Sequence, residues 1–324
     1  MAKVTLIEAG RLAALQEMRR DPTVWVLGED VARGGLWGQY KGFFDEFGAD
    51  RAVSTPISES TIMGAGLGAA LVGTRPIIEM RIFDFVMCAM DELINQIAKI
   101  RYMFGGQARP ALVVRMPHGM WRNSAAQHSQ MLEAWFAHLP GVIVVTPSTA
   151  EDTAGLLVQA IRSDDPVLFF DPKDLFGVLG DIAEHIEPIP FGVARQVAEG
   201  DAATVVSWSA AMPVAIKAAK MLAAEGINVD LLDLRTIWPW DQEAVIASVK
   251  KTGRLLVVHE AVEVSGFGAE IIAHVLDEVG TDVLKAAKRI AAPRIPIPYS
   301  PPLEAEVRVS PEKVFEAVKG LIAL

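Results

Sequence analysis

Length, composition and charge restrict this 324-residue chain to a few protein classes. The chain is too long for one small core and suits two domains. It is 51% hydrophobic, yet no run approaches the roughly 18 uninterrupted apolar residues that a membrane span needs. A net charge of −10 with no basic run argues against a nucleic-acid surface. The excess of apolar residues predicts burial against other subunits.

The N-terminus and the cysteine content narrow these classes further. Thr5 and Glu8 form a capping-box pattern in place of the apolar region of a signal peptide, so we expect a cytoplasmic protein. Cys88 is the only cysteine, which excludes an intrachain disulfide and a multi-cysteine metal site. We expect Cys88 to be a small buried hydrophobic residue.

The first half of the chain alternates short β-rich runs with helical patterns. Runs of valine and isoleucine without polar alternation are typical of strands buried on both faces, which predicts a parallel sheet covered by helices. The expected strands are Val24–Leu27, Ile77–Met80, Leu112–Arg115, Val142–Val145 and Val167–Phe170. The expected helices are Leu6–Arg19, Thr61–Val72, Val86–Phe104, Gln130–His138 and Ala150–Arg162.

Prolines and glycines interrupt this alternation in the middle of the chain and indicate a linker. The pattern then resumes, which predicts a second, smaller α/β domain. Its expected strands and helices are Thr204–Ser207, Val229–Leu232, Leu255–His259, Ala211–Glu225, Gly268–Val279 and a last helix after Ser310. The predicted division is a first domain at 1–175, a linker at 176–190 and a second domain at 191–324.

A carboxylate stands where one of these helices is expected to begin. Glu59 follows Thr55-Pro56-Ile57-Ser58, and in a first helical turn it would stabilise the positive end of the helix dipole. The helix carries Gly64, Ala65, Gly66, Gly68, Ala69 and Ala70, a face with almost no side chains. Because glycines cost helix stability, this face predicts close approach by another backbone.

An imidazole lies in the loop ahead of the expected helix Gln130–His138. A loop imidazole at such a junction can titrate near neutral pH and exchange a proton, which makes His128 a candidate acid or base. A surface or packing histidine is the alternative. His118, Arg122 and Asn123 precede it and can meet a carboxylate, but we expect them to be flexible and solvated.

Motifs along nearly the whole chain resemble one family. In order they are Gly28-Glu29-Asp30, Thr55-Pro56-Ile57-Ser58-Glu59, Arg75-Pro76-Ile77-Ile78-Glu79, Tyr102-Met103-Phe104-Gly105-Gly106, Gln127-His128-Ser129-Gln130, Pro147-Ser148-Thr149, Asp233-Leu234-Arg235-Thr236 and His259-Glu260-Ala261. They resemble the beta subunit of the thiamine-diphosphate-dependent decarboxylase component of 2-oxoacid dehydrogenase complexes. That family includes pyruvate, branched-chain 2-oxoacid and acetoin dehydrogenases. The resemblance implies a transketolase-like α/β fold, in which a pyrimidine-binding parallel-sheet domain precedes a transketolase C-terminal domain.

The resemblance also implies roles for single residues. Glu59 matches the glutamate that hydrogen-bonds the aminopyrimidine ring of thiamine diphosphate. Phe85 matches an aromatic residue that packs on that ring, although a core aromatic is the simpler interpretation of its sequence setting, and Ile57 is a further candidate for the same wall. His128 matches a histidine that helps acyl transfer to a lipoyl group. Several members bind potassium through backbone carbonyls at positions that match Leu112, Val113, Ala160, Ser163 and Asp165.

One signature of thiamine enzymes is missing. There is no Gly-Asp-Gly followed by an asparagine pair, the motif that holds magnesium and diphosphate, since Gly180-Asp181 and Gly200-Asp201 lack the third glycine. The resemblance therefore implies that an alpha subunit shares the cofactor and holds the magnesium. It implies an α2β2 heterotetramer that is active only when assembled, oxidatively decarboxylates a small 2-oxoacid and acylates lipoyl groups of an acyltransferase core.

Two departures from the family leave the substrate open. Asp171 stands where relatives usually have glutamate, and Gly38 stands where many pyruvate and branched-chain relatives have arginine. An acetoin dehydrogenase beta subunit is one alternative. Others are half of a transketolase, a fragment of a deoxyxylulose-phosphate synthase and a non-catalytic scaffold of the same fold. Glu59 and His128, which stand in their motif settings, count against the scaffold.

Overall fold

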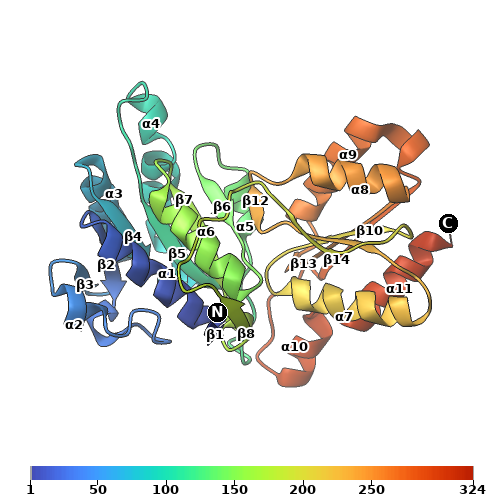
Figure 1. Ribbon diagram of the computed structural model, residues 1–324, viewed down its shortest axis with the longest axis horizontal. Coiled ribbons are helices and arrows are strands. Elements are labelled where there is room, and N and C mark those ends of the chain that lie inside the picture. The colour runs from blue at the N-terminus through green and yellow to red at the C-terminus, as the bar shows by residue number, and fades with distance from the viewer. Residues whose placement is uncertain (1, 324) are drawn as a thin grey trace. The chain divides into compact units, whose positions relative to one another are not determined.

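The computed structural model describes residues 2–323 and groups them into two compact units (Figure 1). The first unit extends to His118 and resumes over Trp135–Phe191. The second unit holds Gly119–Ala134 and the chain from Gly192 onward. Each unit is therefore built from two separate stretches of sequence, which the sequence patterns did not predict.

The segment 176–190, which we predicted to be a linker, is packed into the first unit. Within it, β8 (Leu179–Ile182) pairs antiparallel with β1 (Ala2–Thr5). The Gln16 side chain accepts a hydrogen bond from the amide of Ile186 at 2.9 Å and donates one to its carbonyl at 2.9 Å. Backbone pairing and side-chain hydrogen bonds therefore hold this segment in the first unit.

A parallel sheet forms the middle of the first unit, as predicted. Its strands are β2 (Val24–Glu29), β3 (Ala52–Thr55), β4 (Arg75–Glu79), β5 (Val113–His118), β6 (Ile143–Val145) and β7 (Val167–Pro172). They lie in the order β6-β7-β5-β4-β2-β3, and each neighbouring pair is parallel. The last residues of β2, β3 and β4, which are Glu29, Thr55 and Glu79, therefore lie at one edge of the sheet.

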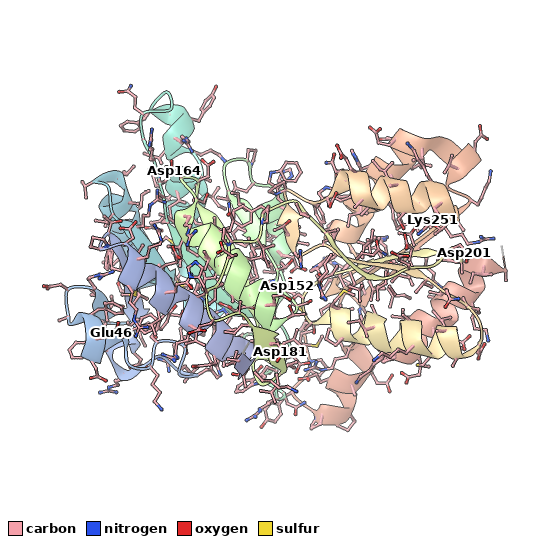
Figure 2. The ribbon with its side chains drawn as sticks, viewed as in Figure 1. Glu46, Asp152, Asp164, Asp181, Asp201 and Lys251 are labelled. Carbon is pink, nitrogen blue, oxygen red and sulfur yellow. The ribbon has the colours of Figure 1, made fainter. Side chains whose placement is uncertain are left out.

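Helices accompany this sheet, and their bounds follow local signals. They are α1 (Leu6–Arg20), η1 (Val31–Arg33), α2 (Phe43–Phe47), α3 (Glu59–Leu71), α4 (Ile100–Met103), α5 (Glu133–Ala137), α6 (Ala150–Arg162) and η4 (Lys173–Leu175). The Thr5 hydroxyl accepts a hydrogen bond from the Glu8 amide at 3.4 Å and so caps α1. The Thr149 hydroxyl accepts from the amide of Asp152, which is labelled in Figure 2, and so fixes the start of α6.

The single helix predicted over Val86–Phe104 is wrong. The chain there forms a 3-10 helix, η2 (Phe83–Ala89), then a π-helix, η3 (Glu92–Ile97), and then α4. The buried apolar residues Phe83, Val86 and Ala89 are spaced by three, which suits the three-residue turn of a 3-10 helix. The helix predicted over Gln130–His138 is likewise shorter, because only α5 forms.

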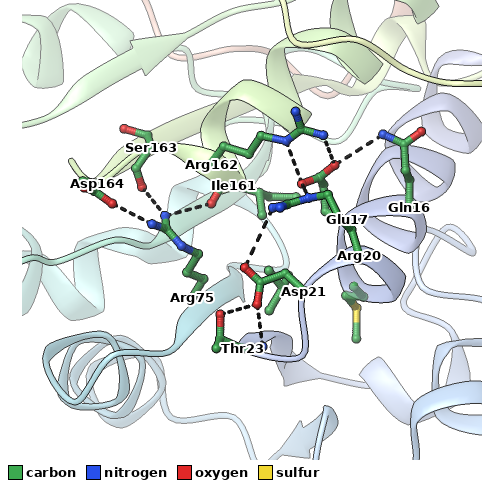
Figure 3. A network of polar contacts seen from close by, with 12 residues as sticks. Gln16, Glu17, Arg20, Asp21, Thr23, Arg75, Ile161, Arg162, Ser163 and Asp164 are labelled. Carbon is green, nitrogen blue, oxygen red and sulfur yellow. Dashed lines mark hydrogen bonds and ion pairs between the residues drawn. The ribbon is translucent and has the colours of Figure 1, made fainter.

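Ion pairs and hydrogen bonds connect α6 and the residues just after it to α1 and β4 (Figure 3). The fully buried Glu17 accepts hydrogen bonds from the guanidinium groups of Arg162, at 2.7 and 2.9 Å, and Arg20, at 2.7 Å. Burial opposes its charge, but these donors lower the pKa of the Glu17 carboxyl below its ordinary value. Arg75, at the start of β4, donates to the carbonyl of Ser163 at 2.8 Å, just past the end of α6.

The second unit is a smaller α/β structure. Its strands are β9 (Arg195–Ala198), β10 (Thr204–Ser207), β11 (Asp230–Asp233), β12 (Thr236–Trp238), β13 (Arg254–Val262) and β14 (Ala286–Ala292). Its helices are α7 (Ala211–Ala224), α8 (Gln242–Thr252), α9 (Phe267–Val283), α10 (Pro301–Val307) and α11 (Pro311–Ile322). The sheet order is β14-β13-β10-β11-β9, in which β9 pairs antiparallel with β11 and the other pairs are parallel. Over residues 2–323, no helix is long and apolar enough to cross a membrane.

A buried acid closes β4. Glu79 is 2% exposed, and it accepts hydrogen bonds from the Tyr40 hydroxyl at 2.6 Å and the Gln39 amide at 3.1 Å. Burial raises the pKa of the Glu79 carboxyl to about 7, although Arg115 and the Tyr40 hydroxyl oppose the rise. Ionisation of this carboxyl near neutral pH therefore costs the folded state free energy.

We predict that Glu79 makes the protein less stable as the pH rises. Between pH 4.5 and about 7 the folded state holds a proton that the unfolded state has lost, so the free energy of unfolding falls across this range. Glu79→Gln keeps the shape and removes the titration. From about pH 5 to 8, the variant should gain roughly 1–3 kcal/mol relative to the parent in urea unfolding. Parallel pH profiles of the two proteins would contradict this explanation.

Candidate active site

Glu59 is the first residue of α3 and follows the carboxyl end of β3. Its side chain is half-buried and stabilises the positive end of the helix. A second acid lies near it at the same sheet edge. Burial raises the pKa of Glu29 at the end of β2, Arg81 opposes the rise and the charge of Glu59 adds to it. Arg81 contacts Glu29 at 3.4 Å and Asp30 at 2.5 Å.

Apolar side chains accompany this acidic edge. Phe83 is the core aromatic of η2, since it is fully buried and its ring centroid lies 5.8 Å from that of Phe136 and 5.2 Å from that of Phe170. Phe85, two residues on, is only half-buried, and η2 packs against α3. Ile57, just before α3, is 76% exposed. Phe85 is therefore partly accessible, and Ile57 is largely accessible, near this edge of the sheet.

The small residues of α3 lie in two different environments. Gly66 packs so closely on the Ile78 side chain that no Cβ atom would fit, which explains one glycine by a side chain and not by the backbone that we expected. Gly68 has open space where a Cβ would lie, and Val72, just past the helix, is 82% exposed. This exposed side of the helix is apolar and smooth.

The loop that carries His128 is folded by its own hydrogen bonds. The Ser124 hydroxyl lies 2.7 Å from the carbonyl of Trp121 and 3.3 Å from that of His128. The amide of His128 donates to the carbonyl of Ala125 at 3.4 Å, and Ala125 has a positive φ of 62°. The His128 side chain is half-buried. An ordered loop thus presents the imidazole.

The expectations for His118 and Cys88 are wrong, and the predicted helix ends before His138. His118 is not solvated, because it is 1% exposed and its ring lies 5.3 Å from that of Phe170. Burial, with the charge of Lys173, lowers the pKa of His118 to about 3, so this imidazole is neutral near pH 7. Cys88 is exposed and not buried, because it falls on the outer side of η2. His138 lies beyond the end of α5 and is also exposed.

The structure divides the candidate residues between the two units. Glu59, Phe85 and Ile57 belong to the first unit, and His128 belongs to the second. Glu29 was not predicted to be a neighbour of Glu59. Its position at the end of a buried strand was a usable signal, since the carboxyl ends of adjacent parallel strands meet at one edge.

The carbonyls that the resemblance assigned to potassium already accept hydrogen bonds. The carbonyl of Leu112 accepts from the Val167 amide at 3.0 Å, that of Ala160 from the Ser163 amide at 3.2 Å, and that of Asp165 from the Ser163 hydroxyl at 3.0 Å. Val113 lies in β5. The Arg75 guanidinium on the Ser163 carbonyl brings a positive charge that disfavours a cation at that oxygen. A potassium site stays a prediction.

Within residues 2–323 no group of three or more His, Cys, Asp or Glu side chains could hold a metal ion.

Comparison with known proteins assigns both parts of the chain to one superfamily. Residues 2–178 match the transketolase pyrimidine-binding domain, and residues 192–314 match the transketolase C-terminal domain. A solved structure described as a split gene transketolase, inactive beta4 tetramer, has the same fold. It superposes with a TM-score of 0.82 over 99% of each chain at 22% identity.

Several relatives are similar over their whole length. The pyruvate dehydrogenase E1 component subunit beta of Rickettsia bellii is 44% identical over 98% of each chain. The 2-oxoisovalerate dehydrogenase subunit beta of Bacillus subtilis is 40% identical over 99% of each chain. The acetoin:2,6-dichlorophenolindophenol oxidoreductase subunit beta of Cupriavidus necator is 43% identical over 89% of this chain and 88% of its own. This chain therefore belongs to the transketolase-like family of beta subunits of the pyruvate, branched-chain 2-oxoacid and acetoin dehydrogenases.

Proposed function

We propose that the chain is the beta subunit of a thiamine-diphosphate-dependent enzyme that oxidatively decarboxylates a small 2-oxoacid and transfers the acyl group to lipoyl groups. One observation carries the proposal. Glu59, a half-buried carboxylate at the start of α3, follows the exposed apolar side chain of Ile57, and η2, which carries Phe85, packs against the same helix. A carboxylate next to apolar side chains fits a flat heteroaromatic ring that has a nitrogen at its edge.

The residues of this chain then have separate tasks. When bound, thiamine diphosphate would supply the carbanion chemistry that the substrate's 2-oxo carbon requires. Glu59 holds a proton at the ring nitrogen of the aminopyrimidine, and Phe85 and Ile57 orient that ring and exclude water from it. His128 exchanges a proton when the acyl group passes to the lipoyl sulfur. The partner subunit supplies the groups that bind the diphosphate and its magnesium.

That partner is an alpha subunit, in an α2β2 heterotetramer bound to a lipoyl acyltransferase core. Support comes from large apolar side chains that the first unit exposes at the end of α4 and just after it: Tyr102 is 86%, Met103 73% and Phe104 59% exposed. Val72, after α3, is also exposed. Such side chains are typical of subunit contacts, because they gain free energy when a partner covers them. We propose a cytoplasmic location for the assembly.

The substrate is tested by a panel. The pyruvate and acetoin relatives are 44% and 43% identical to the chain, so their similarity does not separate the two substrates. The chain, assembled with its alpha subunit, is given pyruvate, branched-chain 2-oxoacids or acetoin, with dichlorophenolindophenol as the electron acceptor. Reduction of the dye with a 2-oxoacid supports the proposal. Reduction with acetoin alone identifies an acetoin dehydrogenase, and no reduction with any of them supports a scaffold.

We predict that Glu59→Gln blocks activation of the cofactor. The substitution keeps the shape of the side chain and removes its charge, so exchange of the thiazolium proton should slow by roughly 10²–10⁴-fold, about 3–5 kcal/mol of barrier. Hydrogen exchange followed by NMR in the assembled enzyme measures this rate. Glu46→Gln, at an exposed carboxylate on α2, is the control and should exchange as the parent does. Near-normal exchange in Glu59→Gln would remove Glu59 from this role.

We predict that His128→Ala impairs acyl transfer more than folding. A half-buried loop side chain adds little to stability, so the melting temperature should stay within a few degrees of the parent's, because surface substitutions usually change stability by about 0.5 kcal/mol or less. Acylation of a lipoyl domain should fall at least about tenfold. His138→Ala, at an exposed histidine, is the matched control. Equal acylation rates in the two variants would return His128 to a packing role.

We also predict that cofactor binding requires the partner. Most of the binding free energy of a diphosphate comes from its charge and its metal, which this chain does not supply. By calorimetry, the chain alone should bind thiamine diphosphate weakly, and addition of the alpha subunit should give tight, magnesium-dependent binding. Tight magnesium-dependent binding by the isolated chain would instead indicate a self-contained thiamine enzyme.

A further inference from the structure

The His128 loop, residues 119–134, is anchored in the second unit on both sides of the histidine. Met120, before it, is fully buried, and Met131, after it, is 6% exposed. Both methionines pack in one apolar cluster with residues from β13, β14 and the chain that follows. Those partners are Ala261, Ala292, Ile297 and Val307. Loop 119–134 thus reaches the core of the second unit at two points around His128.

One polar contact supplements these two anchors. The indole nitrogen of Trp208, which follows β10, donates a hydrogen bond to Glu133 Oε1 at 3.1 Å. Trp208 and Glu133 are each 2% exposed. An indole has a single donor, and burial without an acceptor would leave it unsatisfied. The contact therefore fixes both the direction of the indole and the end of the loop.

A face of the Trp208 indole ring is also in contact with a neighbouring side chain. The Trp208 ring stacks on the His259 imidazole, with centroids 5.2 Å apart and an angle of 16° between the planes. Burial lowers the pKa of His259 to about 4, so the imidazole is neutral near pH 7 and its Nδ1 lies 3.1 Å from the Ala261 carbonyl. A Cβ at Gly266 would lie 2.6 Å from this ring and one at Gly268 would lie 3.0 Å away, so neither glycine can be replaced without moving it.

We propose that Trp208 and Glu133 are positioning residues for His128, acting as a clamp that holds the end of the His128 loop on the C-terminal unit. The clamp touches none of the reacting atoms. Its loss should leave Glu59 and the first steps of the reaction intact and displace only the imidazole. The expected effect on lipoyl acylation rests on the proposed role of His128, but the anchoring of the loop by Trp208 and Glu133 does not.

Two pairs of variants test the clamp in the assembled enzyme. Trp208→Phe removes the donor and keeps an aromatic ring, and Trp240→Phe is the control, since Trp240 is 5% exposed in the same unit and contacts the same Phe267. Glu133→Leu removes the acceptor, whereas Glu133→Gln keeps an oxygen for the indole. We expect Trp208→Phe and Glu133→Leu to slow lipoyl acylation about tenfold, with dye-coupled decarboxylation within about twofold of the parent. The two control variants should keep both rates.

Trypsin gives a readout that does not depend on activity. Arg122 is exposed, and no other lysine or arginine lies between Arg115 and Arg162, so one cleavage reports on the loop. Trp208→Phe and Glu133→Leu should be cut after Arg122 several times faster than the parent, and Trp240→Phe and Glu133→Gln at the parent rate. Unchanged cleavage in Trp208→Phe overturns the clamp. Faster cleavage together with full lipoyl acylation overturns its catalytic purpose. If His128→Ala also acylates normally, the proposed role of His128 fails and the clamp is a feature of folding alone.

Discussion

The first unit depends on a buried ion pair. Arg115 in β5 contacts Asp171 in β7 through two hydrogen bonds, of 3.0 and 3.1 Å, and both side chains are 1% exposed. Burial opposes the charge of Arg115, but Asp171 and Tyr40 outweigh it and raise its pKa. The guanidinium also lies over the Tyr40 ring, and Gly10 leaves room for it, because a Cβ on α1 would lie 2.9 Å from its nitrogen. A helix, two strands and the 34–42 loop therefore meet around one charge. Loss of either partner would leave the other charge uncompensated.

This pair also acts on Glu79. Burial raises the pKa of the Glu79 carboxyl, the positive charge of Arg115 opposes the rise, and the negative charge of Asp171 adds to it. Tyr40 and Gln39 hold the carboxyl in place and with it the end of the loop that contains Gly38. Asp171, which we expected to depart from the family pattern, thus forms a structural ion pair. Of the two departures, the one at Gly38 lies in a loop and is the better candidate for a change of substrate.

Local signals made much of the fold predictable. The bounds of α6 were predicted correctly because Thr149 caps it and the apolar pattern continues to Arg162. Short continuous apolar runs likewise marked β2, β5 and β7. The strands that were missed, such as β3 and β14, carry polar or small residues, and their partners decide their structure. The environment of His118 and Cys88 was misjudged because burial depends on neighbours distant in sequence.

The candidate site was predictable only where a motif stood at the end of an element. Glu59 and Phe85 follow strands, so their placement at one sheet edge follows from the parallel topology. The loop of His128 gave no such signal. Its contacts with Trp208 and with the Met131 cluster span many tens of residues, and no periodicity within the loop encodes them.

The insertion of Gly119–Ala134 into the second unit constrains how a gene for this chain could divide or recombine. A break between Phe191 and Gly192 looks natural on a linear map. Met120, Met131 and Glu133 would then lie on one polypeptide. The other residues of the apolar cluster and the Trp208 indole would lie on another. Each product would expose apolar surface that the intact chain buries. Exchange of the second unit between family members would therefore have to include the His128 loop. This requires a further crossover within the sequence of the first unit.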